Sequence, residues 1–329
     1  MLFSSSGFFA INGSSEAKIA SAQNPHKLYT KSLYCIMTEM KKPYLSLIFF
    51  LVTHLVSAQD GIKPIIDVHL HGFTPETYKF IEGSPPTFED FKNEMRKVFK
   101  TYNIVYAVKS GGQYDEDMEA NMLEGYESNK LLDTIEFKRL IKQGKIQVWG
   151  EIQPMFNGMT LADDAYAPYL KICEQEGIPI ALHTGRGPTN IHLRYPNYRL
   201  ALGDPLLLEP ILIKYPKLKI YLMHAGLPFY ENTLALMDSY PQVFVDLGWI
   251  LYSYRKITQS QAEDFLRKVK KYEMIDRVMF GSDCMYWPDE LENSIKKLDS
   301  FEFLNEEDIR KIFYENAVKF FELDIKKNN

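Results

Sequence analysis

Residues 65–72 read Ile-Ile-Asp-Val-His-Leu-His-Gly, an apolar run that ends in two histidines separated by one residue. The run predicts a buried β-strand over Ile65–His71. Because alternate side chains of a strand share a face, Asp67, His69 and His71 are expected to point the same way. Two imidazoles on one rigid face are suited to bind a metal ion, although two hydrogen-bonded strand histidines would give the same pattern.

The composition is that of an ordinary globular protein. The 329 residues are 46% hydrophobic and 25% charged, which suffices for one large α/β domain or two small ones. The formal net charge is −5 and no long basic run occurs, which argues against nucleic acid as a partner. Three cysteines are too few for a disulfide framework or a clustered-thiolate zinc site.

The N-terminal region is expected to lie outside the folded domain. Residues 1–39 are weakly patterned and are interpreted as a non-native or disordered leader, with Met37 or Met40 as the natural start. Residues 40–58 combine a charged start, an apolar stretch and a small-residue exit, which describe a secretory signal peptide. The remaining residues 59–329 would then be periplasmic or secreted, with the periplasm favoured, and cytoplasmic if the leader is not used.

From residue 64 onward, apolar runs alternate with segments of helical periodicity. The expected strands are 65–71, 104–108, 122–126 (the weakest pattern), 146–152, 178–183, 218–224, 243–247 and 277–283. The expected helices are one capped by Thr87 and those at 134–143, 164–175, 205–214, 232–239, 259–271, 290–298 and 306–321. This alternation predicts a parallel sheet covered on both faces, and eight units match a single-domain (β/α)8 TIM barrel. A doubly wound open sheet is the alternative, but residues 65–72 are not the Gly-rich phosphate loop that it usually has.

Ionisable residues fall at the carboxyl ends of the expected strands. They are His69 and His71 on the first strand, Glu151 on the fourth, His183 on the fifth, His224 on the sixth and Asp283 on the eighth. In a barrel these ends meet at one rim, where such enzymes carry their chemistry. Five histidines remain after the expected cleavage point, and four of them take these positions. The pattern therefore favours a metal site over satisfied core histidines.

The ligand set contains nitrogen and carboxylate but no thiolate. It suits one or two divalent ions, with Zn²⁺ expected first and Mn²⁺, Fe²⁺, Co²⁺ or Ni²⁺ left open. A catalytic metal keeps one coordination position for water and brings the pKa of that water to about 7. Asp283 is the candidate for the group that accepts the proton of this water.

These motifs resemble those of the amidohydrolase superfamily. Asp67-x-His69-x-His71, followed by His183, His224 and Asp283 on later strands, is similar to the amidohydrolase-related branch that includes the aminocarboxymuconate-semialdehyde decarboxylase-like enzymes. The stretches 216–226 and 277–283 support the resemblance, which extends over about residues 64–323.

The resemblance implies roles for the individual residues. His69, His71, His183 and Asp283 would be metal ligands, and His224 would either bind a second ion or polarise the water or the substrate. Glu151 would bridge two metal ions, or else contact the substrate or support a ligand. Asp67 is expected to orient a ligand.

Further residues near the rim are candidates for substrate binding. Arg186 follows His183 by three residues and could hold a carboxylate or phosphate, although a solvated loop charge explains it equally well. Trp249 and Trp287 follow the seventh and eighth strands and could line the pocket or pack under loops. Asp246 ends the seventh strand and is expected to support a ligand or cap the chain.

The favoured function is a metal-dependent hydrolase that cleaves a small-molecule amide, ester or lactone with a metal-activated water. A metal-dependent non-oxidative decarboxylase of a small carboxylic acid on the same scaffold is the alternative, and a binding protein without catalysis is the third possibility. The expected partner is a small-molecule substrate, with no membrane association after signal cleavage, and assembly into a homo-oligomer stays open.

Overall fold

The computed structural model describes residues 63–111, 120–127 and 130–324. The expected leader over residues 1–39 and the expected signal peptide over residues 40–58 lie outside these ranges. No helix in the described ranges combines the length and apolar character needed to cross a membrane.

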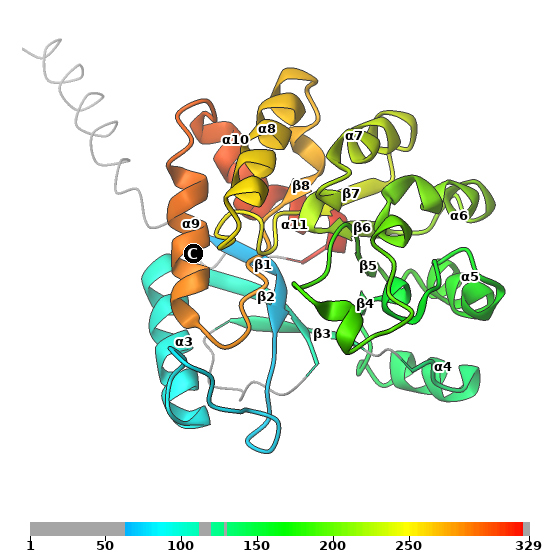
Figure 1. Ribbon diagram of the computed structural model, residues 1–329, viewed down its shortest axis with the longest axis horizontal. Helices are drawn as coiled ribbons and strands as arrows, with labels where there is room; N and C mark the ends of the chain where they lie inside the picture. The colour runs from blue at the N-terminus through cyan, green and yellow to red at the C-terminus, as the bar shows by residue number, and fades with distance from the viewer. Residues whose placement is uncertain (1–62, 112–119, 128–129, 325–329) are drawn as a thin grey trace, which may run out of the picture. The chain divides into compact units, whose positions relative to one another are not determined.

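Parallel strands alternate with helices along the chain (Figure 1). The strands are β1 (Ile65–His71), β2 (Ile104–Ser110), β3 (Asn121–Gly125), β4 (Trp149–Ile152), β5 (Ile180–His183), β6 (Ile220–Met223), β7 (Val243–Asp246) and β8 (Val278–Met279). The α-helices are α3 (Phe88–Tyr102), α4 (Thr134–Lys142), α5 (Ala167–Glu176), α6 (Glu209–Lys214), α7 (Tyr230–Ser239), α8 (Lys256–Lys271), α9 (Pro288–Asp299), α10 (Glu306–Arg310) and α11 (Asn316–Phe321), with a π-helical segment between the last two.

The strands pair in sequence order, β1-β2-β3 in one sheet and β4 to β8 in a second. Backbone hydrogen bonds join the two sheets at both seams. The Val68 N–H donates to the Phe280 carbonyl at 3.0 Å, and the Gln147 N–H donates to the Glu124 carbonyl at 2.8 Å. The parallel order of eight strands confirms the predicted (β/α)8 architecture.

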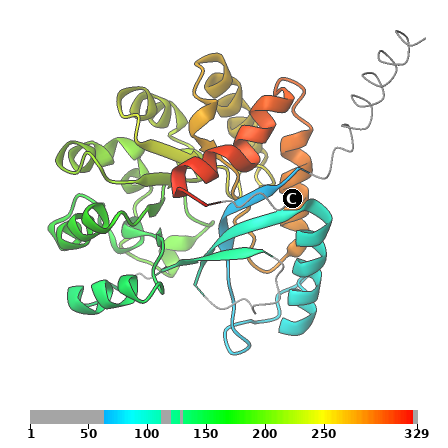
Figure 2. The same cartoon turned by 180° about the vertical axis from the view of Figure 1, so that it is seen from behind.

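Alternate residues of the strands divide the core into two layers. Ala181, Tyr221 and Phe244 pack in one cluster with Phe320 of α11, while their neighbours along each strand pack in the cluster shared with the outer helices. Helix α11 lies across the rear of the barrel (Figure 2), and the Asn316 amide donates to the carbonyls of Ile275 and Val278 at the start of β8. That end of the barrel is therefore filled, and the opposite end carries the ionisable residues.

The first helix begins where the sequence predicts. The Thr87 side chain accepts the Asp90 N–H at 3.1 Å and so satisfies a donor of the first turn. Phe91, Met95 and Phe99 are buried on one face of α3, as their spacing requires.

Two strands that lead to site residues, β6 and β8, end earlier than predicted. Strand β8 has two residues instead of the expected seven over 277–283, and Asp283 has a left-handed φ of 56°. The reason is that the Phe280 N–H donates to the Ile312 carbonyl of the C-terminal segment, outside the strand ladder. Strand β6 likewise ends at Met223, since the His224 N–H donates to the Asp246 carboxylate and His224 has a φ of 62°.

Strand β1 departs from simple alternation. Ile66 and Val68 pack in the cluster that contains Phe320, whereas Leu70 packs in the cluster shared with the outer helices. The pairing register against β2 shifts between Asp67 and Leu70. This irregularity explains why His69 and His71 share a site although the side chain of Asp67 does not join them.

Candidate metal centre

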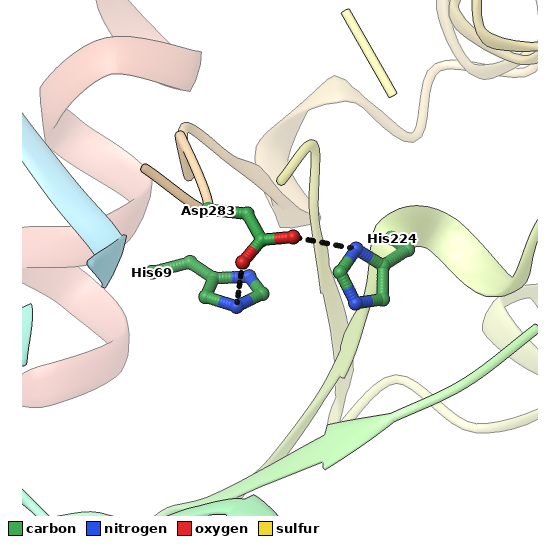
Figure 3. A group of neighbouring side chains, drawn as sticks. All are labelled: His69, His224 and Asp283. Atoms are coloured by element: carbon green, nitrogen blue, oxygen red, sulfur yellow. Dashed lines mark ion pairs between the residues drawn. The ribbon is translucent and has the colours of Figure 1, made fainter. Parts of the chain in front are cut away.

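Asp283 lies between His69 and His224 (Figure 3), and His71 is a third histidine neighbour. Its Oδ1 is 2.9 Å from His71 Nε2 and 3.3 Å from His69 Nε2, and its Oδ2 is 4.0 Å from His224 Nδ1. The three histidines are buried, while the Asp283 side chain is 15% exposed. One carboxylate oxygen therefore faces the imidazoles of β1, and the other faces the segment after β6.

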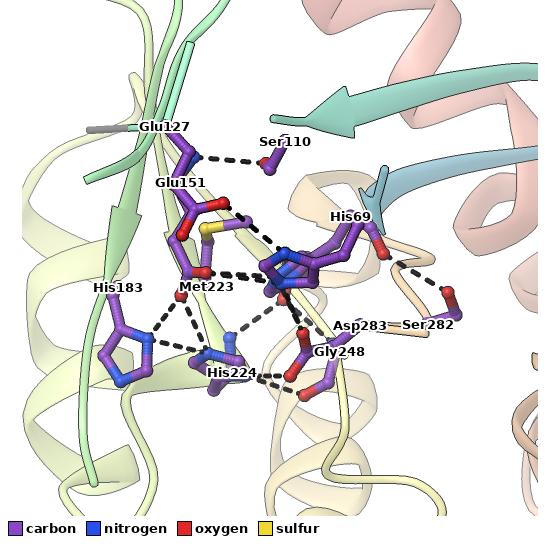
Figure 4. Close-up of polar contacts among 12 residues, drawn as sticks. His69, Ser110, Glu127, Glu151, His183, Met223, His224, Gly248, Ser282 and Asp283 are labelled. Atoms are coloured by element: carbon purple, nitrogen blue, oxygen red, sulfur yellow. Dashed lines mark hydrogen bonds and ion pairs between the residues drawn. The ribbon is translucent and has the colours of Figure 1, made fainter. Parts of the chain in front are cut away.

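Glu151 of β4 faces His69, His183 and His224 (Figure 4), and His71 is a fourth histidine neighbour. Its Oε2 is 3.5 Å from His71 Nε2 and 3.8 Å from His69 Nε2. Its Oε1 contacts His183 Nδ1 directly and is 3.5 Å from His224 Nε2. The Glu151 N–H donates to Ser110 Oγ at 3.1 Å, which holds this side chain at the centre. The two carboxylate oxygens of Glu151 therefore face different pairs of histidines.

The outer ring nitrogen of each histidine faces an oxygen atom. The pairs are His69 Nδ1 with Asp246 Oδ2 at 3.0 Å, His224 Nδ1 with the Gly248 carbonyl at 2.9 Å, His183 Nε2 with the Arg186 carbonyl at 3.3 Å and His71 Nδ1 with Glu127 Oε2 at 3.5 Å. An N–H directed at each oxygen leaves the lone pair of the inner nitrogen for a cation.

His69 Nε2 tests whether these residues fit a metal ion. This nitrogen is buried and has no hydrogen-bond partner, although carboxylate oxygens of Asp283 and Glu151 lie 3.3 and 3.8 Å away. A buried imidazole nitrogen without a partner is costly unless it donates its lone pair. Three sets of donor atoms, each within 4.8 Å, occur in the described part of the chain: His69–His224–Asp283, His69–His71–Glu151 and Glu151–His183–His224. The donor set therefore fits divalent ions.

Asp246 holds two of the histidines at once. Beside its bond to His69 Nδ1, its Oδ1 accepts the backbone N–H groups of His224 at 2.8 Å and Gly248 at 2.9 Å. A Cβ atom at Gly248 would lie 2.4 Å from His69 Nδ1, so only glycine allows this approach. The expectation that Asp246 supports a ligand agrees with these contacts.

Asp67 acts on backbone groups. Its carboxylate accepts the N–H groups of His69 at 3.0 Å and Ser282 at 2.9 Å, and the Ser282 hydroxyl at 2.6 Å. Burial raises the pKa of Asp67 to about 6, against the lowering effect of these hydrogen bonds. Asp67 thus orients the backbone at His69 and at Ser282, on either side of the centre.

The imidazoles and carboxylates stabilise each other's charged forms. Burial alone would lower the pKa of His71, but the Asp283 and Glu127 carboxylates raise it to about 10. Burial alone would raise the pKa of Glu151, but His183, His224 and His69 hold it well below its usual range. The carboxylates create a negative potential at the imidazoles, and the same potential would stabilise a bound cation.

The predicted substrate residues lie on loops of the same rim. The Arg186 guanidinium donates to Thr258 Oγ1 at 3.2 Å and Gln261 Oε1 at 2.9 Å on α8. Trp249 is half-buried, and its backbone N–H donates to the Ser282 carbonyl at 3.0 Å, next to Asp283. Trp287 Nε1 donates to the Glu82 carbonyl at 3.1 Å, so this indole connects the loop after β1 to the loop after β8.

A family model described as amidohydrolase matches residues 134–323, more than half of the chain. The chain belongs to the amidohydrolase family. This assignment confirms the predicted resemblance and supports an enzyme, since metal-dependent activity is typical of the family.

The solved structures that this amidohydrolase resembles share its fold at low sequence identity. A probable 2-pyrone-4,6-dicarboxylic acid hydrolase from Acinetobacter baumannii has a TM-score of 0.56 and 16% identity, with 79% of this chain and 99% of that chain covered. A dihydroorotase from Campylobacter jejuni has a TM-score of 0.54 and 14% identity, with 81% and 85% covered. A 2,6-dihydroxybenzoate decarboxylase has a TM-score of 0.51 and 14% identity, with 80% and 99% covered. The fold thus occurs in hydrolases and in a decarboxylase.

A curated relative, protein fluG of Emericella nidulans, is 26% identical over 115 residues. The match covers 35% of this chain and 12% of that protein, so the chain spans a small part of its length.

Sequence reasoning missed several groups of the centre. Glu127 follows the weak third strand, and the rule that carboxylates at strand ends face the rim could have found it. Gly248 and Ser110 act through a backbone carbonyl and a hydroxyl, which no spacing pattern reveals.

Proposed function

We propose that this amidohydrolase is a metal-dependent hydrolase of a small-molecule amide, ester or lactone. The observation that carries the proposal is the position of Glu151, with one carboxylate oxygen toward the His69–His71 pair and the other toward the His183–His224 pair. Both pairs direct ring nitrogens toward one carboxylate, an arrangement that suits two ions bridged by an acid.

The proposed ligands form two groups. His69, His71 and Asp283 would hold one ion, His183 and His224 the second, and Glu151 would bridge them. When bound, a divalent cation polarises a carbonyl group and lowers the pKa of a water molecule to about 7. Zn²⁺ fits this nitrogen and carboxylate set, as do the other divalent metals that the sequence left open.

Asp283 is proposed to move the proton. Its Oδ1 lies against the β1 histidines, whereas Oδ2 has the longer approach to His224 and the side chain is partly exposed. The Oδ2 atom can therefore accept a proton from the attacking water and donate it to the departing amine or alcohol. The Gly248 carbonyl accepts the His224 Nδ1–H and so fixes the orientation of this ring, which is proposed to face the substrate.

Arg186, Trp249 and Trp287 are proposed to bound the substrate pocket. Their backbone or ring contacts connect them to His183, to the segment before Asp283 and to the loop after β1, respectively. These three residues would determine which substrates enter the pocket, whereas the metal centre would determine the reaction.

The test combines elemental analysis with a substrate panel. We expect a metal-to-protein ratio above one, lost to about one in Glu151→Gln, and hydrolysis of lactones, esters or amides by the metal-loaded protein. Glu136→Gln, an exposed residue of α4, is the matched control. Release of CO₂ from aromatic or enol carboxylic acids without any hydrolysis would replace the hydrolase by the decarboxylase alternative.

A further inference from the structure

Two loops at the rim are rich in arginine and poor in acids. Residues 184–204 after β5 contain three arginines and one acidic residue, and residues 247–255 before α8 contain Arg255 and no acidic residue. Four of the five arginines elsewhere in the described ranges form ion pairs, such as Arg139 with Glu136 and Arg267 with Glu263. Arg186 and Arg255 have no ion pair with any described carboxylate.

Neutral groups hold these two guanidinium groups in place. Arg186 donates to Thr258 and Gln261 of α8. Arg255 donates to Thr189 Oγ1 and stacks on the rings of Trp249 and Tyr254, each 5.3 Å from the guanidinium carbon. Both side chains are half-buried and ordered by these contacts, yet their positive charges are not compensated.

The two positive charges act on each other. Burial and the nearby charge of Arg255 lower the pKa of Arg186. Arg255 donates to Thr189, three residues after Arg186, and Arg186 donates to Thr258, three residues after Arg255. The two like charges therefore lie in one loop pair, where a bound anion would reduce their repulsion.

Both loops are attached to the metal centre. The Arg186 carbonyl accepts the His183 Nε2–H at 3.3 Å, and Trp249 directly follows Gly248, whose carbonyl accepts the His224 Nδ1–H at 2.9 Å. The segment of Arg186 and the ring on which Arg255 stacks are therefore each adjacent to a group that contacts a histidine of the centre.

We propose that Arg186 and Arg255 bind a carboxylate of the substrate that is separate from the reacting group, while Trp249 lies against the adjoining planar part. The proposal rests on the proposed function in that it takes the metal centre as the place of reaction. It goes beyond that function by naming the substrate class, a carboxylate-bearing planar molecule, and by assigning Arg255 a role in specificity. A planar guanidinium binds a carboxylate with two parallel hydrogen bonds, which a lysine cannot do.

Binding without turnover provides the test. The metal-loaded protein is titrated by calorimetry with benzene-1,3-dicarboxylate and with 3-carbamoylbenzoate, which keeps one carboxylate for the metal and replaces the other by a neutral amide. We expect the dicarboxylate to bind about ten- to a hundred-fold more tightly, and we expect Arg255→Gln and Arg186→Gln to abolish that preference. Arg255→Lys should keep only part of it. Arg267→Gln, on the same helix α8 and paired with Glu263, is the control and should leave the preference unchanged.

Three results would overturn the proposal. They are equal affinity for the two ligands in the parent protein, a preference that survives in both glutamine variants, and a tighter arginine-dependent binding of 3-phosphonobenzoate, which would assign the subsite to phosphate. Metal content and circular dichroism identify glutamine variants that fail to fold. If they fail, the Arg255→Lys variant is the test, and an undiminished preference in it would overturn the proposal. An arginine-dependent preference in a protein that hydrolyses nothing would retain the subsite and reject the hydrolase, whereas hydrolysis without the preference would do the reverse.

Discussion

Replacement of Asp246 by Asn should weaken metal binding although Asp246 touches no metal position. One oxygen of Asp246 accepts the backbone N–H groups of His224 and Gly248, and the other faces His69 Nδ1 at 3.0 Å. An asparagine that keeps its oxygen on the two backbone donors must turn its amide NH₂ group toward His69. The opposite rotamer would leave two buried N–H groups against an NH₂ group, at about 1–3 kcal/mol for each.

The favoured rotamer changes the tautomer of His69. Its Nδ1 must then accept a hydrogen bond, so the ring proton moves to Nε2, the nitrogen that lies 3.3 Å from Asp283 Oδ1 and has no hydrogen-bond partner. A protonated Nε2 has no lone pair for a metal ion. Loss of a group that orients a ligand typically costs about 10- to 100-fold in metal affinity, or about 1.4–2.7 kcal/mol.

Competition with a chromophoric chelator measures this loss. The expected result is a 10- to 100-fold higher Kd for Zn²⁺ in Asp246→Asn, with far-ultraviolet circular dichroism unchanged, while Asp238→Asn on the exposed side of α7 binds like the parent protein. An unchanged Kd in the folded Asp246→Asn variant would refute the tautomer argument, because the variant cannot keep both the backbone contacts and an acceptor for His69.

Three further predictions concern the centre and its surroundings. Replacing His69 and His71 together by Ala should abolish bound metal and activity while the barrel still folds, and full metal occupancy in elemental analysis would contradict this. Asp283→Asn should keep much of the metal, since five other ligands remain, but lower kcat by about 100-fold or more; a parental kcat would exclude Asp283 as the base. Burial, together with Asp283 and Asp289, raises the pKa of Glu290 from 4.5 to about 7. The folded state therefore holds a proton that the unfolded state has lost between pH 4.5 and 7, and stability falls as the pH rises through this window. Glu290→Gln should remove that loss and gain about 1–2 kcal/mol at pH 8 relative to pH 4 in denaturant unfolding; an equal difference at both pH values would argue against a shifted carboxyl group.

The order of the elements could be predicted because it depends on local pattern. The apolar run at Ile65–His71 and the cap at Thr87 each fix an element through neighbours in sequence, and both lie where predicted. The length of β8 could not be predicted in this way. It depends on the Ile312 carbonyl, which takes the Phe280 N–H, and that contact exists only when the C-terminal segment has packed.

The candidate site could likewise be predicted only in part from the sequence. The rule that parallel strands end at one rim was enough to bring Glu151, His183 and His224 together, without knowledge of any contact. It could not decide the role of Glu151, because a bridge and a single contact differ only in where the two carboxylate oxygens point. The rule also could not predict that the Arg186 side chain extends to α8, where its guanidinium donates to Thr258 and Gln261.

Protonation of the imidazoles is the step that a ligand motif leaves undetermined. His69 binds a cation through Nε2 only if its proton stays on Nδ1, and the group that keeps it there is 177 residues away at Asp246. The Gly248 carbonyl does the same for His224 and is held by the same carboxylate through its own N–H. Two histidines from distant strands therefore depend on one buried acid. It follows that a chain with His-x-His on β1 but a neutral, non-accepting residue at the end of β7 should keep the barrel and bind metal poorly, because strand packing needs only the apolar pattern whereas the centre needs the acceptor.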